Sequence, residues 1–245
     1  MLPPRPFFKF EPKDDAVWKV LYERQLPHIM ELGSQDYWIA GFDGLGMTAD
    51  RIPDMEKLSA RLHELSGWVL YSTDTIFADG QDWFEHLQRK EFLMSEYIRE
   101  MKDIDYTPLP DVFHDAFGHL PSMAIPRYVE MVSTFTEAIL ACDPAKRRGL
   151  GSIWWHTVEF GLIKENGKMK AFGAGLASSY GELRHAFTPG NVDIRPFVPE
   201  DIMQFRPSPH SYHERLWLMD NFEQLEEFLY DWIKNGKGAP VAESV

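Results

Sequence analysis

Five segments of the chain repeat apolar residues at intervals of three and four, and this periodicity constrains its fold more than any other feature. Such spacing puts the apolar side chains of a segment on one helical face, which other elements must cover. The sequence therefore predicts a mainly α-helical protein, with helices over residues 14–32, 54–66, 82–101, 127–142 and 220–234. We expect Pro27 to kink or split the first helix and Gly67 to end the second.

Strand signals are few and short. The best pair is 162–163 and 170–172, which flanks Asn166-Gly167, a dipeptide typical of a tight hairpin turn. Residues 186–213 are rich in proline and have no clean period, so we expect a long ordered loop there.

The length of 245 residues is enough for one good-sized core, and no Gly/Ser- or Pro-rich linker interrupts residues 14–236. We expect one domain over residues 1–245, with an extended arm over 1–13 and a flexible tail over 237–245.

Charge and cysteine content exclude several classes of function. The 25 Lys and Arg face 38 Asp and Glu, and a net charge of −13 repels nucleic acid and anionic membranes. The single cysteine, Cys142, cannot form an internal disulfide, which favours a reducing compartment and hence the cytoplasm. No apolar run approaches the roughly 18 residues that cross a bilayer, so we expect no membrane partner.

Two histidines five residues apart mark the most informative segment, Pro110-Asp111-Val112-Phe113-His114-Asp115-Ala116-Phe117-Gly118-His119-Leu120-Pro121. Five residues turn an ideal α-helix about 140° beyond one revolution, so the imidazoles do not share a face as in the zinc-protease motif H-E-x-x-H. Convergence on one ion requires Gly118 to relax the helix end. Glu159, an acid inside an aromatic run, is the best third ligand, because burying a carboxylate without a partner costs several kcal/mol.

Two imidazoles and one carboxylate around an open metal face form the facial triad of non-haem Fe(II) oxygenases. Each residue also has a purely structural explanation. An isolated histidine in an apolar segment is more often a core or capping imidazole, and a buried glutamate is as often the partner of a lysine or arginine. A zinc hydrolase and a non-catalytic binding module both stay open as alternatives.

Three motifs taken together closely resemble the catalytic domain of the tetrahydropterin-dependent aromatic amino acid hydroxylases. They are Pro110-Asp111-x-x-His114-Asp115-x-x-Gly118-His119-x-Pro121, Thr157-Val158-Glu159-Phe160-Gly161 and Gly173-Ala174-Gly175-Leu176-x-Ser178-Ser179-x-Gly181-Glu182. The resemblance runs from about residue 14 to 185. It implies a helical basket around one mononuclear iron site, with short β hairpin elements.

The resemblance implies roles for individual residues. His114, His119 and Glu159 would bind Fe(II) and be catalytic, while Asp111 and Ser178 would orient the ligand imidazoles. Arg99 would hold the substrate carboxylate, although without the family it would be taken for a surface helix charge. The other implied substrate positions are Thr107, Pro110, Trp155, Gly175 and Ser178.

The resemblance also implies a pterin site. A tetrahydropterin, with O2 as co-substrate, would contact Ala78, Gly80, Trp83, Asp115 and Trp154. Trp83 would stack on the pterin ring, because it matches a position where the family usually has phenylalanine. Asp115 stands where the family commonly has glutamate.

The expected activity is hydroxylation of a free aromatic amino acid, with phenylalanine to tyrosine as first choice. Trp155 and Phe92 match the phenylalanine-specific members, although a tryptophan hydroxylase of the same family stays open. Two departures stand out: His156, expected to be a surface or supporting imidazole and not a ligand, and the divergent segment 205–213. The family's regulatory domain and tetramerising tail are not matched, so we expect a bacterial-like monomer.

Overall fold

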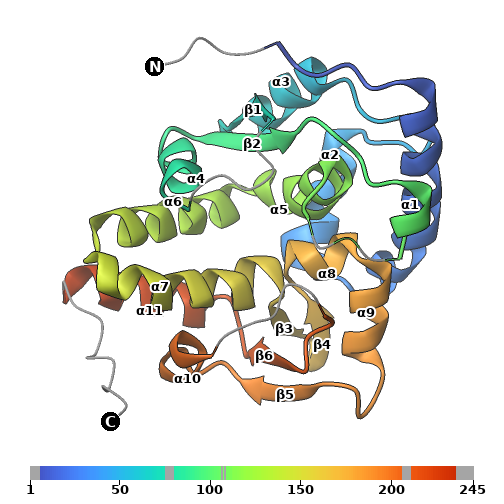
Figure 1. The fold of residues 1–245 in the computed structure, drawn as a ribbon. Helices are drawn as coiled ribbons and strands as arrows, with labels where there is room; N and C mark the ends of the chain where they lie inside the picture. Colours follow the sequence, from blue (N-terminus) through green and yellow to red (C-terminus); the bar gives the residue numbers. More distant parts are fainter. Residues whose placement is uncertain (1–5, 75–79, 106, 108, 206–210, 236–245) are drawn as a thin grey trace.

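Two antiparallel helices, α6 (Pro126–Ala141) and α7 (Pro144–Trp154), cross the middle of the molecule in the computed structural model (Figure 1). The structure describes residues 6–74, 80–105, 107, 109–205 and 211–235. The helix α1 (Pro12–Leu32) runs nearly perpendicular to this pair at the right-hand edge of the view, and α11 (Glu223–Lys234) packs on α6. The other helices of the described residues are α2 (Ala40–Leu45), α3 (Met55–Ser66), α4 (Gly80–Gln88), α5 (Leu120–Met123), α8 (Ala174–Ser178), α9 (Tyr180–Phe187) and α10 (Pro199–Gln204).

In the part of the chain that the structure describes, two small sheets lie at opposite ends of the molecule (Figure 1). In the first, β1 (Val69–Thr73) pairs in parallel with β2 (Glu91–Ser95). In the second, the strand order is β4-β3-β6-β5, formed by β3 (Leu162–Glu165), β4 (Lys168–Ala171), β5 (Asp193–Pro196) and β6 (Arg215–Met219). The predicted hairpin is confirmed as β3–β4, whose turn residues Asn166 and Gly167 both have positive φ, at 51° and 75°.

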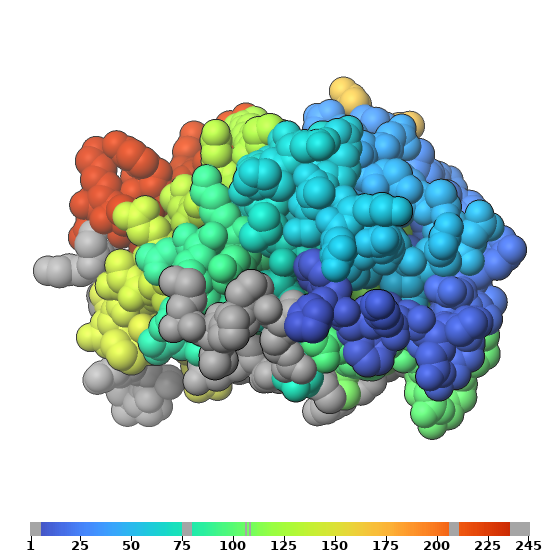
Figure 2. All heavy atoms as spheres, turned by 90° about the horizontal axis from the view of Figure 1, so that it is seen from above, coloured from blue at the N-terminus to red at the C-terminus, as the bar shows by residue number. Residues whose placement is uncertain are grey.

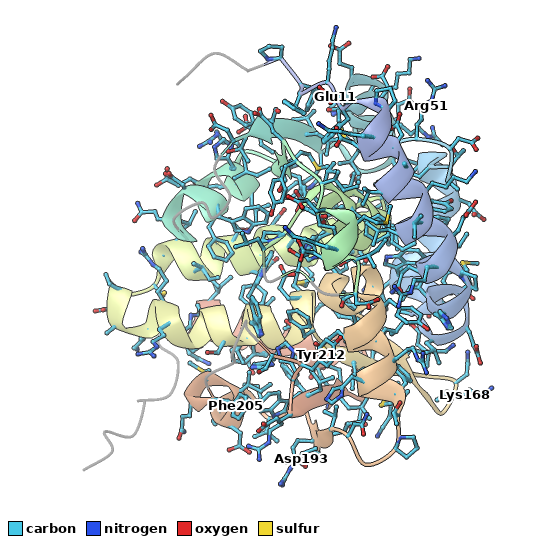
Figure 3. The ribbon with its side chains drawn as sticks, turned by 45° about the vertical axis from the view of Figure 1, so that its right-hand side comes forward. Glu11, Arg51, Lys168, Asp193, Phe205 and Tyr212 are labelled. Atoms are coloured by element: carbon cyan, nitrogen blue, oxygen red, sulfur yellow. The ribbon has the colours of Figure 1, made fainter. Side chains whose placement is uncertain are left out.

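The surface around the first sheet is built from the N-terminal half of the chain. Seen from above, residues of α3 and β1, coloured cyan, occupy the centre of this face, with α1 in blue beside them (Figure 2). The side-chain view places Glu11 and Arg51 at this end and Asp193 at the other (Figure 3).

Several helical boundaries agree with the sequence. Asp54 caps α3 with bonds from the amides of Glu56 and Lys57, and Gly67 ends it at φ 78°. We expected Pro27 to kink or split the first helix; α1 continues through Pro27 in a single run, so the split does not occur. The last helix begins at Glu223, three residues later than predicted.

The predicted helix over 82–101 is wrong beyond its second turn. Helix α4 stops at Gln88, and Lys90 takes a left-handed φ of 59°, which few non-glycine residues adopt. The apolar residues that follow, Phe92, Leu93 and Met94, are all buried in β2. A short continuous apolar run suits a strand covered on both faces as well as it suits a helix, and pairing with β1 decides between them.

The expected long loop over 186–213 is also broken by regular structure. It begins within α9 and contains β5 and α10. Strand β5 is held by parallel pairing to β6, and α10 packs on α7. Neither β5 nor α10 has a local periodicity from which it could have been predicted. Residues 206–210, in the same segment, lie outside the described residues, as do Ala78 and the tail over 237–245.

Within the described residues, three π-helical turns interrupt the α-helical pattern: η1 (Gln35–Ile39), η3 (His114–His119) and η4 (Trp155–Glu159). A short 3₁₀ turn, η2 (Met101–Asp103), lies between β2 and η3. Buried aromatic rings pack around η3, and the stacked pair Phe113 and Phe117, with centroids 4.7 Å apart, is its anchor. The rings that surround this pair belong to Trp18, Tyr22, Trp38 and Phe42. Among the described residues, no helix combines the length and the apolar character needed to span a membrane.

The contact between α2 and α5 gives a test of this packing. A Cβ added at Gly41 would lie 1.9 Å from the carbonyl oxygen of Pro121, on the helix that directly follows His119. Gly41→Ala should therefore lower the free energy of unfolding by about 1–3 kcal/mol through overpacking. Gly151→Ala in α7, where an added Cβ meets nothing within 4 Å, should instead raise it by about 0.5–1 kcal/mol through helix propensity. Urea unfolding of both variants checks this, and equal stability of the two would contradict it.

Candidate metal centre and substrate site

The π-helical turn η3 brings the imidazoles of His114 and His119 together. Their Nε2 atoms lie 3.1 Å apart and their ring planes are almost perpendicular, at 88°. In a π-helix the backbone hydrogen bond joins residues five apart, so these residues are neighbours on the surface of the turn. The 140° mismatch of an α-helix is thereby greatly reduced.

Gly118 allows this turn to lie against α8. A Cβ at this position would come within 2.7 Å of the carbonyl oxygen of Ala174. The indole of Trp38 donates to the Gly118 carbonyl at 3.2 Å. The sequence predicted that Gly118 relaxes a helix end, whereas the whole turn from His114 to His119 is π-helical. Gly118 instead allows this turn to lie close to the backbone of α8.

Glu159 closes the cluster from a second π-helical turn, η4. Its Oε2 lies 3.5 Å from His114 Nε2 and 3.3 Å from His119 Nε2, and its Oε1 accepts a bond from Trp154 Nε1 at 3.2 Å. Gly173 approaches the main chain here, since a Cβ on it would lie 2.3 Å from the Glu159 carbonyl oxygen. Across the described residues, these three side chains form the cluster of His, Cys, Asp and Glu donors that could hold a metal ion.

Burial and mutual attraction set the charges of this cluster. Burial alone would raise the pKa of Glu159, but His119 and His114 outweigh it and lower that pKa to about 2. Burial lowers the pKa of His114 to about 4, with His119 adding to the effect. Burial opposes protonation of His119 too, yet the Glu159 carboxylate raises its pKa. The site therefore keeps an ionised carboxylate beside His114, a neutral imidazole, as metal binding requires.

Ser178 fixes the tautomer of His114. The Ser178 hydroxyl donates to the Ala174 carbonyl at 2.9 Å, so its oxygen is left to accept from His114 Nδ1, also at 2.9 Å. His114 therefore carries its hydrogen on Nδ1 and directs the lone pair of Nε2 toward His119 and Glu159.

Asp111 acts differently from the expectation. Among the described residues, its carboxylate accepts bonds from the Arg99 side chain at 2.8 and 2.9 Å, from the Arg99 amide at 2.9 Å and from the His114 amide at 3.0 Å, and from no imidazole. It therefore positions the backbone at the start of η3 rather than a ligand ring. Arg99 is buried, not a surface charge, and the two-pronged ion pair lowers the pKa of Asp111 despite the burial that opposes it.

Among the described residues, two of the expected pterin positions, Trp83 and Asp115, lie near the cluster. Trp83, half-buried on α4, meets Phe92 edge-on at 5.4 Å, and Phe92 in turn lies 5.2 Å from the His119 ring. Asp115 is buried and accepts from the Ser95 amide at 2.7 Å, and burial raises its pKa to about 7.

The two remaining pterin positions differ in exposure. Gly80 is the exposed first residue of α4. Trp154 packs between Phe84 and Phe135 in the core and reaches Glu159 only through its N–H.

The expected substrate positions come from three segments: the loop before η3, the turn η4 and the helix α8. Thr107 donates to the Leu109 carbonyl at 3.2 Å, and the hydroxyl of Tyr97 donates to the Pro110 carbonyl. A Cβ on Gly175 would lie 2.4 Å from the ring of Phe160, so glycine is needed there. Trp155 is half-buried at the start of η4, four residues before Glu159.

Sequence reasoning missed one polar group, formed by Glu182, His213 and Trp155. The carboxylate of Glu182 lies 2.8 Å from His213 Nδ1, and Trp155 Nε1 donates to His213 Nε2 at 2.8 Å. Both Glu182 and His213 are buried, at 2% and 6% exposure. The signal was an acid and a histidine 31 residues apart, which only the folded chain brings together.

His156 is neither a surface residue nor a supporting hydrogen-bonding group. It is fully buried, and neither of its ring nitrogens has a hydrogen-bond partner in the described part of the chain. Its ring packs against Trp217 at 4.4 Å and Phe205 at 5.5 Å. Burial, with a smaller effect of His213, lowers its pKa to about 3.

Comparisons with known proteins agree with this geometry. The family model described as biopterin-dependent aromatic amino acid hydroxylase matches residues 3–238. The phenylalanine-4-hydroxylase of Chromobacterium violaceum is 30% identical over 91% of this chain and 74% of its own length. That of Mesorhizobium japonicum is 30% identical over 90% of this chain and 80% of its own length.

A solved structure is also similar. The Chromobacterium violaceum phenylalanine hydroxylase with bound iron(III) and oxidised cofactor 7,8-dihydrobiopterin has a TM-score of 0.85 and 27% identity. The match covers 99% of this chain and 90% of that one.

The buried imidazole of His156 gives a prediction for stability. His156→Phe should raise the free energy of unfolding at pH 7.5 by about 1–3 kcal/mol, because two buried nitrogens without partners are removed. The unfolded histidine titrates near its ordinary pKa of 6.5, whereas the folded one stays neutral down to about 3. The wild type therefore loses stability from this group as the pH falls below 6.5, and the advantage of the variant should grow at pH 5.

Urea unfolding of the two metal-free proteins at pH 7.5 and pH 5 measures this difference. A variant that is no more stable than the wild type at either pH would show that His156 has a partner in solution.

Proposed function

Because the chain belongs to the biopterin-dependent aromatic amino acid hydroxylases, we propose that it hydroxylates the ring of free phenylalanine to give tyrosine. The reaction uses Fe(II), a tetrahydropterin and O2. The observation that carries the proposal is the convergence of His114 Nε2, His119 Nε2 and Glu159 Oε2. The relatives named phenylalanine-4-hydroxylase support phenylalanine as the substrate.

The donor atoms fit a single metal ion. Ligands on one face of an octahedral ion, at metal–donor distances of about 2.1 Å, lie about 3 Å from one another. The separations of 3.1, 3.3 and 3.5 Å are close to this value. The three donor atoms all lie within 4.8 Å of one another, and this supports a single metal at the cluster.

We assign His114, His119 and Glu159 to hold Fe(II) and to leave its remaining positions open. When bound, iron and reduced pterin supply the activation of O2, which no amino acid side chain can supply. The chain contributes orientation, through the Ser178 bond to His114 and the Asp111 bond to the start of η3. It also surrounds the site with buried aromatic side chains, which exclude water.

Arg99 is our candidate for the substrate carboxylate. Asp111 holds one edge of the guanidinium at two points, which fixes its plane and leaves further N–H donors on the other nitrogens. Thr107, Pro110, Trp155, Gly175 and Ser178 complete the proposed pocket. A ring placed between Trp155 and the metal ligands would lie within reach of the open iron face.

We assign the pterin to the side of Trp83. Its indole offers a large aromatic face near Phe92 and His119. Gly80, Asp115 and Trp154 are further proposed contacts, and Ala78 is a proposed contact outside the described residues. A protonated Asp115, favoured by a pKa near 7, would donate a hydrogen bond to a pterin acceptor.

The proposal includes a cytoplasmic monomer whose partners are small molecules. The net charge of −13 and the single cysteine support it. Light scattering on a size-exclusion column should give a mass near 28.5 kDa.

Product analysis tests the proposed reaction. The protein is loaded with Fe(II) without oxygen and is then given each aromatic amino acid, tetrahydropterin and O2. Tyrosine formed from phenylalanine, in step with pterin oxidation, is the expected result. Turnover without oxygen consumption would favour a zinc hydrolase, and no oxidation with any amino acid would favour a binding module.

The three ligands give a prediction for metal content. Alanine at His114, His119 or Glu159 removes a donor atom, so each variant should lose most of its bound iron and all coupled hydroxylation while it keeps its fold. Iron is measured by mass spectrometry and the fold by circular dichroism. Unchanged iron content in all three variants would contradict the assignment of these residues as iron ligands.

Trp155 gives a prediction for substrate preference. A bulky indole on the pocket wall leaves room for a benzene ring but crowds a second indole, so the wild type should prefer phenylalanine over tryptophan. Trp155→Phe should shift the ratio of kcat/KM values toward tryptophan, and pocket size accounts for about 1–3 kcal/mol of such discrimination. A wild-type preference for tryptophan, or no shift in the variant, would show that the segment 205–213 sets the choice.

A further inference from the structure

The group formed by Glu182, His213 and Trp155 is a directional chain of hydrogen bonds. An indole N–H can only donate, so His213 Nε2 must accept from Trp155 over their 2.8 Å contact. A neutral imidazole that accepts at Nε2 carries its hydrogen on Nδ1, and that hydrogen points at Glu182 Oε1, 2.8 Å away. Each donor in the chain therefore has one acceptor, and the order Trp155, His213, Glu182 cannot be reversed.

The hydrogen-bond chain is anchored at its Glu182 end. Glu182 Oε1 also accepts from the backbone amide of His213 at 2.9 Å, so the carboxylate holds both the ring and the main chain of this residue. Glu182 lies on α9, whereas His213 lies just before β6. Figure 3 shows the preceding residue, Tyr212, beside α9, consistent with its 5.3 Å ring contact to His185. A buried carboxylate and imidazole held this way are costly to move apart.

The Trp155 end of the hydrogen-bond chain lies next to the candidate metal ligand Glu159. Trp155 opens the π-helical turn that ends at Glu159, and its ring packs on Phe160 at 4.9 Å. The His213 ring packs on the same phenylalanine at 4.2 Å. The indole is thus held by a directed hydrogen bond and by the ring of Phe160, yet it is only half-buried. Its exposed part is available to a ligand.

We propose that Glu182 and His213 are positioning residues that fix the Trp155 indole as the wall against which the substrate ring packs. This inference rests on the proposed function, since it assumes an aromatic amino acid beside the metal. Because the indole N–H is engaged by His213, the wall offers the substrate an apolar face. A free indole could rotate or bind water, and the pocket would lose shape.

Kinetics of His213→Phe test the role. The variant keeps a ring against Phe160 but has no nitrogen to accept from Trp155. The KM for phenylalanine should rise about three- to tenfold, which corresponds to the loss of one hydrogen bond, while kcat changes less than about twofold. In the Trp155→Phe background, which has no indole N–H, the same substitution should change KM by less than about twofold.

Two further variants distinguish loss of this hydrogen bond from a general effect of substitution. Glu182→Gln can donate to Nδ1 and so favour the tautomer that turns an N–H toward Trp155, and KM should rise in the same direction by a smaller factor. His156→Phe is the matched control, because this buried imidazole lies 5.9 Å from His213 but has no hydrogen bond within the described residues. Its KM should stay within about twofold of the wild type.

A spectroscopic measurement follows the hydrogen bond without turnover. In metal-free protein labelled with ¹⁵N-tryptophan, the indole signal that is missing in Trp155→Phe belongs to Trp155. It should move upfield in His213→Phe and stay in place in His156→Phe. No movement would overturn the chain of hydrogen bonds.

The kinetic outcomes separate the two proposals. An active wild type with an unchanged KM in His213→Phe, or an equal rise in His156→Phe, would overturn the positioning role. A wild type that hydroxylates no amino acid, although its indole signal behaves as expected, would contradict the proposed function and with it the role of the wall.

Discussion

The π-helical turn over His114–His119 is the constraint on which the site depends. An α-helix would direct the two imidazoles to faces about 140° apart. The turn is held by the stacked rings of Phe113 and Phe117, and it lies on α8 because Gly118 has no side chain. Core packing therefore sets the geometry of the candidate metal ligands.

The third ligand depends on a second interruption of the same kind. The turn η4 carries Glu159 at its end and Trp155 at its start, so one short segment supplies both a metal ligand and a wall of the proposed pocket. Electrostatics then complete the cluster, because the histidines keep the buried carboxylate ionised. The same segment contains His156, which is buried without a hydrogen-bond partner among the described residues.

The sequence predicted the candidate ligand residues better than it predicted the strands and side-chain contacts that hold them in place. Motifs at His114, His119 and Glu159 stand in the chain itself, and helical periodicity announces α1, α3, α6 and α11. Strands β1 and β2 escaped prediction because parallel pairing, and not local propensity, decides their conformation. The contacts of Asp111 with Arg99, and of Glu182 with His213, join residues whose proximity exists only in the folded chain.

The central claim is that one iron ion is held by His114, His119 and Glu159. A crystal structure of the iron-loaded protein, with anomalous scattering recorded at the iron edge, tests it most directly. We expect one strong peak at about 2.1–2.2 Å from His114 Nε2, His119 Nε2 and a Glu159 carboxylate oxygen. A peak bound to other residues, or a Glu159 turned away from a metal held by the histidines alone, would contradict it.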